Sequence, residues 1–291
     1  MQRIRFIIPY FGKWPFWMPF FLRTCAHNRD IDWLFFTDCD VPPDAPGNTV
    51  FRQTNFSSYC RDVSHKLGIR FAPTSPYKLC DLKPALGHVH VSELDGYDFW
   101  GFSDIDLVYG ALRNYFTDER LARFDLLSTH ERRISGHLCL MRNTEEMRTC
   151  FQQVRGWQAM LADTKHIAFD EAAFTRLFIR HKNWPAWLQR ASDNLNSLRK
   201  RSEFAESFST PYGRIPWHDG GMVFPNFWRW QHGHLTNDRD GDREFPYFHF
   251  IGWKDKAPWQ ESAATAFLAD PGLAAQDRWR VTQMGFARCD K

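Results

Sequence analysis

The chain has 291 residues, of which 43% are hydrophobic and 24% charged, the balance of an ordinary globular protein with room for one large domain and an appendage. A formal net charge of only +3, without a long basic block, gives no indication of a nucleic-acid partner. Seven cysteines without a CxxC pair, and no recognisable signal peptide, argue against a disulfide scaffold or zinc site and predict a cytosolic protein.

Peripheral contact with a membrane stays open. The apolar stretch at residues 14–22 is too short to cross a bilayer and contains two prolines. The thirteen Trp and twenty-seven Phe residues are assigned mainly to core packing, with sugar-binding or membrane-interface surfaces as the alternative. The basic triplet 199–201 is interpreted as a solvated face, with contact to anionic lipid at the inner face of the membrane as the alternative.

The N-terminal third alternates strand-like and helix-like segments. Buried strands are predicted at residues 3–9 and 32–37, with a helix at about 15–28 between them. This order predicts a right-handed βαβ unit with parallel strands. A short strand at 50–53, a helix at 57–67 and a helical segment at 77–91, interrupted at Pro84, follow.

The alternation continues to about residue 180 and then fades. Further strands are predicted at residues 97–103, 124–128, 136–141 and 245–251, and further helices at 112–121, 145–161, 169–180 and 260–268. Residues 183–245 are expected to form irregular, aromatic-rich connections. The predicted fold class is α/β, with a mostly parallel sheet flanked by helices.

The most informative stretch is GYDFWGFSDID, at residues 96–106. An aromatic run of strand length ends in Asp104 and Asp106, which project together from the carboxyl end of the strand because residues two apart share a face. Ile105 anchors the opposite side. Ligands bind at this end of an open α/β sheet, and two adjacent carboxylates repel each other unless a cation holds them. The stretch predicts a site for Mg²⁺ or Mn²⁺.

The Asp-x-Asp pattern alone is weak, because it occurs five times in this chain. The copies within residues 238–242 are interpreted as a surface loop, without the closing Glu of a calcium-binding EF-hand. Only the pairs at 38/40 and 104/106 follow strand-like apolar runs. The preceding sequence therefore distinguishes two of the five Asp-x-Asp pairs as candidate sites.

Together with two flanking motifs, the central stretch resembles a GT-A-type glycosyltransferase. Lys78-x-x-Asp81-x-Lys83-Pro84 precedes it, and His249-x-x-Gly252-Trp253-Lys254 lies near the end. The order is most similar to an uncharacterised bacterial family of polysaccharide-biosynthesis transferases with a KxxDxKP…GYDFWGxxDxD pattern. The resemblance covers about residues 3–256 and implies one GT-A-like catalytic domain over 1–256. Within it, residues 1–110 form the nucleotide-sugar half and 111–256 the acceptor half, and 257–291 form a C-terminal helical tail.

The resemblance also implies a nucleotide-sugar donor held through Mn²⁺ or Mg²⁺. Asp104, Asp106 and His249 would be the metal ligands, with His249 binding as a neutral imidazole. Lys254 would contact the diphosphate, although it lies closer to the glycine than in the similar glycogenin-type transferases. A half-buried structural histidine is the alternative for His249.

Further donor contacts are assigned to residues at strand ends and in the upstream motif. Asp81 and Lys83 resemble an Asp and Arg of toxin-type and mannosyl-type transferases, with a spacing one residue shorter and a Lys that lacks bidentate geometry. Lys78 belongs to the same motif. A polar pair at a helix end is the alternative. The donor-binding prediction also includes Pro9, Tyr10 and Asp38, which end the first two strands and would border the base and ribose. A capped turn is the alternative for Asp38.

An inverting transferase needs a carboxylate that takes the proton of the acceptor hydroxyl. Asp170 and Glu171 are candidates because GT-A folds often place an acid on the helix after the strands that follow the metal site; helix N-terminal acids are the alternative. Asp219 is a further candidate. A retaining enzyme needs no such base, so the stereochemical outcome stays open.

Three functions are compatible with these residues. The leading hypothesis is a glycosyltransferase that moves a sugar, with a UDP-sugar as the expected donor, to a glycan or lipid-linked saccharide in surface polysaccharide biosynthesis. A non-catalytic glycan-binding or scaffold relative and a metal-dependent phosphohydrolase are the alternatives. Against the hydrolase, no His-Asp cluster with two-metal spacing lies near 104–106.

Overall fold

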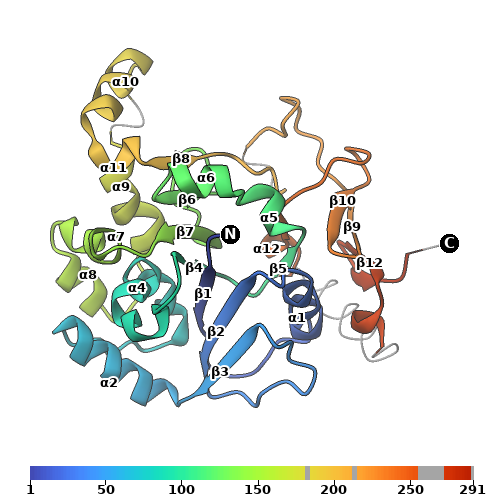
Figure 1. Ribbon diagram of the computed structural model, residues 1–291, viewed down its shortest axis with the longest axis horizontal. Helices are drawn as coiled ribbons and strands as arrows, with labels where there is room; N and C mark the ends of the chain where they lie inside the picture. The colour runs from blue at the N-terminus through green and yellow to red at the C-terminus, as the bar shows by residue number, and fades with distance from the viewer. Residues whose placement is uncertain (181–183, 212–214, 255–271, 290–291) are drawn as a thin grey trace.

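The computed structural model describes residues 1–180, 184–211, 215–254 and 272–289, and a seven-stranded sheet forms its centre (Figure 1). The strands are β1 Ile4–Pro9, β2 Ile31–Thr37, β3 Thr49–Gln53, β4 Phe99–Ser103, β6 Leu126–Ser128, β7 Leu138–Arg142 and β8 Ser202–Phe204. Their order is β3-β2-β1-β4-β7-β6-β8. The first four are mutually parallel, β7 is antiparallel to both neighbours, and β8 is parallel to β6. The predicted α/β fold class with a mostly parallel sheet is confirmed.

Helices cover both faces of this sheet. Alternation along β1 directs Ile7 to one hydrophobic core and Phe6 to the other. The core around Ile7 includes side chains from α2 (Phe56–Leu67), α4 (Leu86–Val89), α7 (Glu145–Thr149) and α9 (Thr175–Phe178). The core around Phe6 includes side chains from α1 (Met18–His27), α5 (Leu112–Tyr115) and α6 (Asp118–Arg123).

Three segments predicted as helical are interrupted, and a break was predicted only in the first of them, at Pro84. Residues 76–94 alternate 3-10 turns with α3 (Leu79–Leu82) and α4, and Pro84, which has no N–H to donate, lies in a 3-10 turn. Between α7 and α8 (Trp157–Ala162), Gly156 adopts a left-handed φ of +76°. The segment that begins at residue 169 opens with a π-helical turn, Phe169–Phe174, before α9.

A second, four-stranded antiparallel sheet corrects two predictions. It contains β9 (Phe227–Gln231), β10 (His234–Asn237), β12 (Arg278–Thr282) and β13 (Gly285–Ala287), in the order β10-β9-β12-β13. Residues 183–245 are therefore less irregular than predicted, and the described part of the supposed helical tail forms strands. Trp230 and Trp279 stack at 4.9 Å in its core. The predicted helix at 260–268 lies outside the described residues.

The basic triplet at 199–201 follows α10 (Ala186–Leu195) and largely overlaps α11 (Ser197–Lys200). Arg199 pairs with Asp193 at 3.4 Å, and Arg201 pairs with Asp125 at 2.7 Å. Two of its three cations are thus held by carboxylates of this chain, and only Lys200 is exposed. Among the described residues, no helix is both long enough and apolar enough to cross a membrane.

Candidate active site

Asp104 and Asp106 lie at the carboxyl end of β4, where the strand order reverses. From β1 the chain continues to β2 and β3 on one side, while β4 pairs with β1 on the other, so the carboxyl ends of β1 and β4 flank a crevice. The Asp104 N–H donates to the His137 carbonyl at 3.0 Å, and the Ile105 side chain is buried in the core beneath. The Asp104 side chain is 33% exposed and that of Asp106 only 6%, so the two carboxylates face the crevice from different depths.

His249 reaches this pair through strand pairing. The strand β5 (Leu107–Tyr109) starts directly after Asp106 and pairs with β11 (Tyr247–His249), so that Leu107 lies opposite His249. One candidate ligand atom from each of Asp104, Asp106 and His249 lies within 4.8 Å of the others. The structure thus brings together the three residues predicted as metal ligands, although Asp106 and His249 are 143 residues apart in the sequence.

Two lysines and the imidazole balance the negative charge of the carboxylates. The Lys254 ammonium lies 2.7 Å from Asp106 Oδ2, and His249 Nε2 lies 3.2 Å from the same oxygen. Burial by itself would raise the pKa of the Asp106 carboxyl, but His249 and Lys254 outweigh burial and hold this pKa below its ordinary value. The Lys83 ammonium lies 2.5 Å from Asp104 Oδ1. The Asp106 carboxylate is therefore ionised, the state in which a carboxylate can bind a metal ion.

The donor set fits a divalent metal. Two carboxylates and one imidazole are ligands that Mn²⁺ and Mg²⁺ accept, and Mn²⁺ accepts the nitrogen more readily. Thr210 Oγ1 lies 3.4 Å from His249 Nδ1, which leaves Nε2 directed at Asp106 as the ligand atom. These three residues could hold the metal that the sequence analysis predicts, and their chemistry does not distinguish between the two ions.

The crevice opens into a cavity of about 510 Å³, which we call the donor cavity. Pro9 and Tyr10 at the end of β1 lie on its wall, as do Lys83, Asp104 and Lys254. Much of the remaining wall is apolar, with lining residues Ile7, Ile8, Phe11, Pro15, Trp17, Leu79 and Leu86. A cavity of this size with a few charged groups at one end is typical of a site for a small organic ligand.

Asp38 is not on the wall of the donor cavity. It is exposed at the end of β2, and its Oδ1 accepts a hydrogen bond from the Gly12 N–H at 2.8 Å. Gly12 has a φ of +116°, a conformation that favours glycine, so Asp38 stabilises the turn after β1. The turn-capping alternative describes this residue better than a donor contact.

The three charged residues of the upstream motif have different surroundings: Lys83 contacts the metal-ligand group, whereas Lys78 and Asp81 contact each other. Lys83 donates to Asp104 and, at 2.7 Å, to the Gly136 carbonyl. Lys78 and Asp81 instead form a buried ion pair at 2.9 Å, with side chains 1% and 0% exposed. The Asp81 carboxylate also accepts the N–H groups of Ile167 and Phe169 at 2.9 and 2.6 Å. These two side chains fix the segment before Asp170, so the predicted donor contact is replaced by a structural role.

Asp170 lies in a smaller cavity of about 130 Å³, which we call the central cavity and which shares Tyr77, Cys80, Lys83, Asp104 and Ile251 with the donor cavity. Its carboxyl group is buried, and Oδ1 has no hydrogen-bond partner. Burial raises the pKa of Asp170 to about 7; Lys83 lowers this pKa and Glu171 raises it further. Ala168 enters the π-helical turn with a left-handed φ of +54°, and such strain is frequent at functional sites.

Glu171 is tied to the backbone and to an arginine. Its Oε1 accepts the Gly136 N–H at 3.3 Å, and its Oε2 pairs with Arg133 at 3.1 Å. Asp219 is not among the residues that line the donor and central cavities: it accepts the Gly221 N–H at 2.9 Å and pairs with Arg239 on the surface. Of the three predicted catalytic carboxylates, Asp170 alone is both in the central cavity and unpaired at one oxygen.

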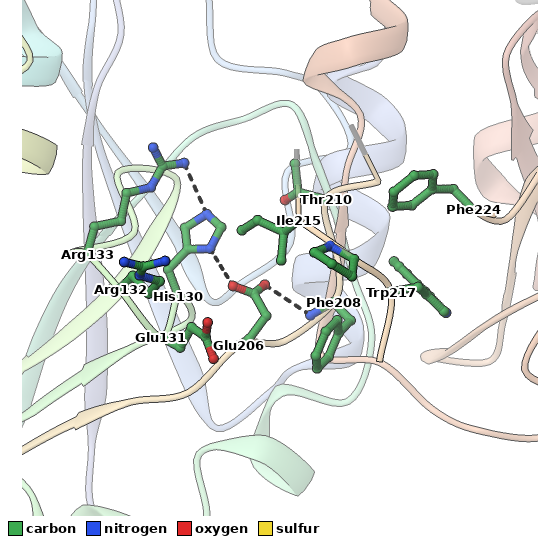
Figure 2. A pocket seen from close by; sticks show the side chains of 11 residues that line it. His130, Glu131, Arg132, Arg133, Glu206, Phe208, Thr210, Ile215, Trp217 and Phe224 are labelled. Atoms are coloured by element: carbon green, nitrogen blue, oxygen red, sulfur yellow. Dashed lines mark hydrogen bonds and ion pairs between the residues drawn. The ribbon is translucent and has the colours of Figure 1, made fainter. Parts of the chain in front are cut away.

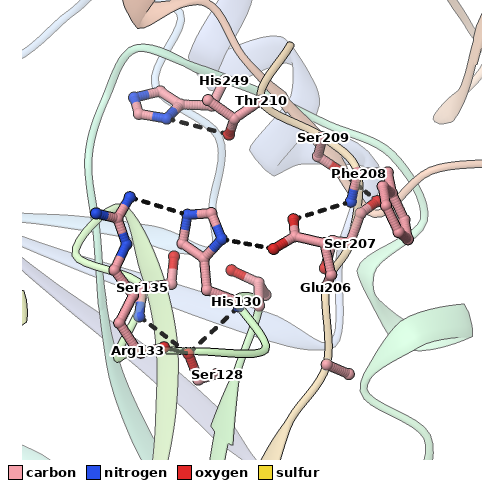
Figure 3. A network of polar contacts seen from close by, with 12 residues as sticks. Ser128, His130, Arg133, Ser135, Glu206, Ser207, Phe208, Ser209, Thr210 and His249 are labelled. Carbon is pink, nitrogen blue, oxygen red and sulfur yellow. Dashed lines mark hydrogen bonds and ion pairs between the residues drawn. The ribbon is translucent and has the colours of Figure 1, made fainter. Parts of the chain in front are cut away.

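Several polar residues near the metal-ligand group were not predicted (Figure 3). The His137 ring lies 4.2 Å from the His249 ring, and its Nε2 hydrogen-bonds the Tyr247 hydroxyl at 2.7 Å. Burial lowers the pKa of His137, so a neutral imidazole lies beside His249. His130 and Glu206 form a further pair at 2.8 Å. The available signal was His130, between the strands predicted at 124–128 and 136–141, and His137, within the second of them. No spacing in the sequence connects His130 to Glu206.

Solved structures similar to this chain are glycosyltransferases. The galactosyltransferase LgtC, in complex with donor and acceptor sugar analogs, is 12% identical over 72% of this chain and 90% of its own, with a TM-score of 0.37. Mouse xyloside xylosyltransferase 1 is 10% identical over 70% of this chain and 95% of its own (TM-score 0.36). The glycosyltransferase GlyE of Streptococcus pneumoniae TIGR4 is 10% identical over 69% of this chain (TM-score 0.33), which spans 44% of GlyE. At these TM-scores the likeness by itself carries no conclusion about activity.

No protein with a curated description matches the sequence. A family model described as "Family of unknown function (DUF6625)" matches residues 6–276, a range that includes nearly all of the seven-stranded sheet, strands β9 and β10 of the second sheet, and all three candidate metal ligands. The chain belongs to the DUF6625 family.

Proposed function

We propose that this chain is a metal-dependent glycosyltransferase that moves a sugar from a nucleotide-sugar donor, with a UDP-sugar as the expected donor, to a saccharide acceptor. The observation that carries the proposal is the convergence of Asp104, Asp106 and His249 at the strand-order reversal, where the two aspartates line the donor cavity and His249 lines the adjoining central cavity. A nucleoside diphosphate needs a cation for its phosphates and an apolar wall for its base, and this region has candidate ligands for the cation beside an apolar wall. A surface polysaccharide as the acceptor is part of the same proposal.

The residues of this chain have distinct tasks in such a transfer. A bound divalent cation would neutralise charge on the leaving diphosphate. Lys254, which is 26% exposed at the rim of the same cavity, adds a positive charge near the phosphates. The ion pair with Lys83 holds the Asp104 carboxylate in place. Each group favours departure of the nucleoside diphosphate from the anomeric carbon.

Asp170 is the candidate base for an inverting reaction. As the acceptor oxygen bonds to the anomeric carbon and the bond to the diphosphate breaks, the hydroxyl proton passes to the free Asp170 oxygen. A pKa of about 7 suits this task, because the carboxylate is available near neutral pH and still binds the proton well. The described residues contain a single group of three candidate ligands, which disfavours a two-metal phosphohydrolase.

A thermal-shift panel of nucleoside diphosphates, with and without Mn²⁺, tests the proposal. UDP or GDP at one hundred times its dissociation constant stabilises the folded state by about 2.7 kcal/mol, which corresponds to a rise in Tm of roughly 5 °C or more. The rise should require Mn²⁺, vanish with chelator and be lost in Asp106→Asn. Asp62→Asn, an exposed aspartate on α2 that lines none of the cavities, is the matched control and should retain the shift.

Two results would contradict the proposal. If no nucleoside diphosphate raises Tm in the presence of Mn²⁺, the scaffold alternative becomes the better account. If the shift persists in Asp106→Asn, nucleotide binding does not depend on the metal-ligand group. Asp170→Asn should keep the nucleotide-dependent shift and lose transfer, which separates donor binding from catalysis.

A further inference from the structure

A third cavity, of about 200 Å³, continues from the central cavity, and we call it the outer cavity (Figure 2). It shares His130, Arg133 and Thr210 with the central cavity, which in turn shares Lys83 and Asp104 with the donor cavity. The central cavity, which contains Asp170, therefore adjoins both of the others. A molecule bound in the outer cavity lies next to the cavity that contains Asp170.

The outer cavity has two unlike walls. Figure 2 shows charged and hydrogen-bonding side chains on one side and apolar rings on the other. The polar wall consists of His130, Glu131, Arg132, Arg133 and Glu206, and the apolar wall of Phe208, Ile215, Pro216, Trp217 and Phe224. A sugar ring has the same division, with C–H groups on its faces and hydroxyls around its edge. Aromatic rings and convergent polar groups are the two elements that recognise it.

Hydrogen bonds connect three side chains of the polar wall to one another (Figure 3). His130 Nδ1 lies 2.8 Å from Glu206 Oε2, and Arg133 Nη2 lies 3.2 Å from His130 Nε2. Because arginine can only donate, Nε2 accepts, and the imidazole donates its Nδ1 proton to Glu206. The side chains of His130 and Glu206 are 5% and 9% exposed. Their positions are thus fixed by one another rather than by solvent.

The segment that carries the apolar wall is tied both to this polar wall and to the metal-ligand group. Glu206 Oε1 accepts the Phe208 N–H at 3.2 Å, and Phe208 has a left-handed φ of +51°, which bulky residues rarely adopt. One residue later, the Ser209 carbonyl accepts the His249 N–H at 2.8 Å. The strained turn therefore holds the Phe208 ring at the cavity at a fixed distance from His249.

From this arrangement we propose that the outer cavity binds one sugar ring of the acceptor, next to the ring whose hydroxyl faces Asp170. The inference rests on the proposed glycosyltransferase function and makes it more specific: the acceptor is an oligosaccharide chain. Phe224, a half-buried ring of the apolar wall, stacks on this ring, and the polar wall binds its hydroxyls.

Paired sugars of one and two rings test the inference in the presence of Mn²⁺ and UDP. The probes are methyl glycosides of galactose, glucose, mannose and N-acetylglucosamine, their disaccharide counterparts, and a printed array of defined oligosaccharides. Saturation-transfer NMR should show a disaccharide that binds roughly tenfold more tightly than its monosaccharide, a gain of the size expected for an aromatic contact. Phe224→Ala should abolish this gain, and Phe224→Leu should reduce it. Val223→Ala, which is adjacent and 68% exposed but not in the wall, is the matched control.

The outcomes separate the inference from the proposed function. If UDP and Mn²⁺ bind but no oligosaccharide binds more tightly than its monosaccharide, or if Phe224→Ala leaves the gain intact, the inference is overturned and the transferase proposal stands. If neither UDP nor GDP binds, the transferase proposal itself fails. Farnesyl phosphate is the competing probe: binding that Phe224→Ala weakens would assign the apolar wall to a lipid phosphate and overturn the sugar assignment.

Discussion

Replacement of Asp81 by Asn separates a donor contact from a structural role. The motif around Lys78, Asp81 and Lys83 predicts donor contacts, whereas the structure buries Lys78 and Asp81 against each other and against backbone groups of residues 160–169. The variant retains shape and volume but loses the charge. It leaves the Lys78 ammonium uncompensated in a site where that side chain is 1% exposed.

The magnitude follows from this burial. Removal of one partner from a buried ion pair costs about 3–5 kcal/mol, because the remaining charge is left without compensation. The new amide also directs N–H groups at one of two backbone donors, Ile167 or Phe169, that the carboxylate accepted. Lys78 keeps two carbonyl acceptors at 2.9 Å, which offsets part of the loss. We expect a loss of about 3 kcal/mol and a fall in Tm of roughly 6 °C or more.

Urea unfolding followed by circular dichroism measures this loss, and titration with Mn²⁺ and UDP measures donor affinity below the transition. Asp62→Asn, an exposed aspartate on α2, is the matched control and should be neutral. Lys78→Met combined with Asp81→Asn removes the uncompensated charge while the amide oxygen still accepts one of the two backbone N–H groups, and should recover part of the stability. A variant Asp81→Asn with unchanged stability and weakened UDP affinity would refute the structural assignment and restore the donor contact.

Three further substitutions have defined outcomes. Asp170→Asn should remove the rise in transfer rate through pH 7. Because the folded-state pKa of about 7 lies above the ordinary 3.8, the stability of the wild-type protein falls as pH rises between these values. The variant should therefore be the more stable protein above pH 7, which thermal unfolding at pH 5 and pH 8 measures. Gly101→Ala should destabilise the fold by about 2 kcal/mol or more, since its Cβ would lie 2.5 Å from the Cys139 carbonyl in the neighbouring strand; equal unfolding midpoints would contradict this. Gly136→Ala, whose Cβ would lie 2.8 Å from Asp170 Oδ2, should lower kcat while UDP affinity stays unchanged. A rise in the dissociation constant for UDP would instead show that the substitution disturbs the donor cavity.

The central sheet could be predicted because its strands carry a local signal. The segments β1, β2 and β4 are short apolar runs that end at polar or turn residues, and their order defines the parallel arrangement. Asp104 and Asp106 could be placed at a strand end for the same reason. His249 was assigned only through the resemblance to a glycosyltransferase, since the pairing of β5 with β11 is not a local property of either strand.

The features that were missed depend on tertiary contacts. The pattern Phe-Trp-Arg-Trp-Gln in β9 alternates buried and exposed residues, but its partner β12 lies beyond residue 277, so the second sheet was not foreseen. The spacing of Lys78 and Asp81 indicates one helix face without telling which groups will cover it. His130 and Glu206 are separated by 76 residues and meet only in the folded chain.

Pulsed electron paramagnetic resonance of bound Mn²⁺ tests the central claim most directly, because electron-spin-echo modulation by ¹⁴N reports an imidazole in the coordination sphere. We expect wild-type protein to bind a single Mn²⁺ with this modulation, His249→Gln to lose the modulation, and Asp106→Asn to lose the ion. Bound Mn²⁺ without nitrogen modulation, or with modulation that persists in His249→Gln, would contradict the assignment of these residues as metal ligands.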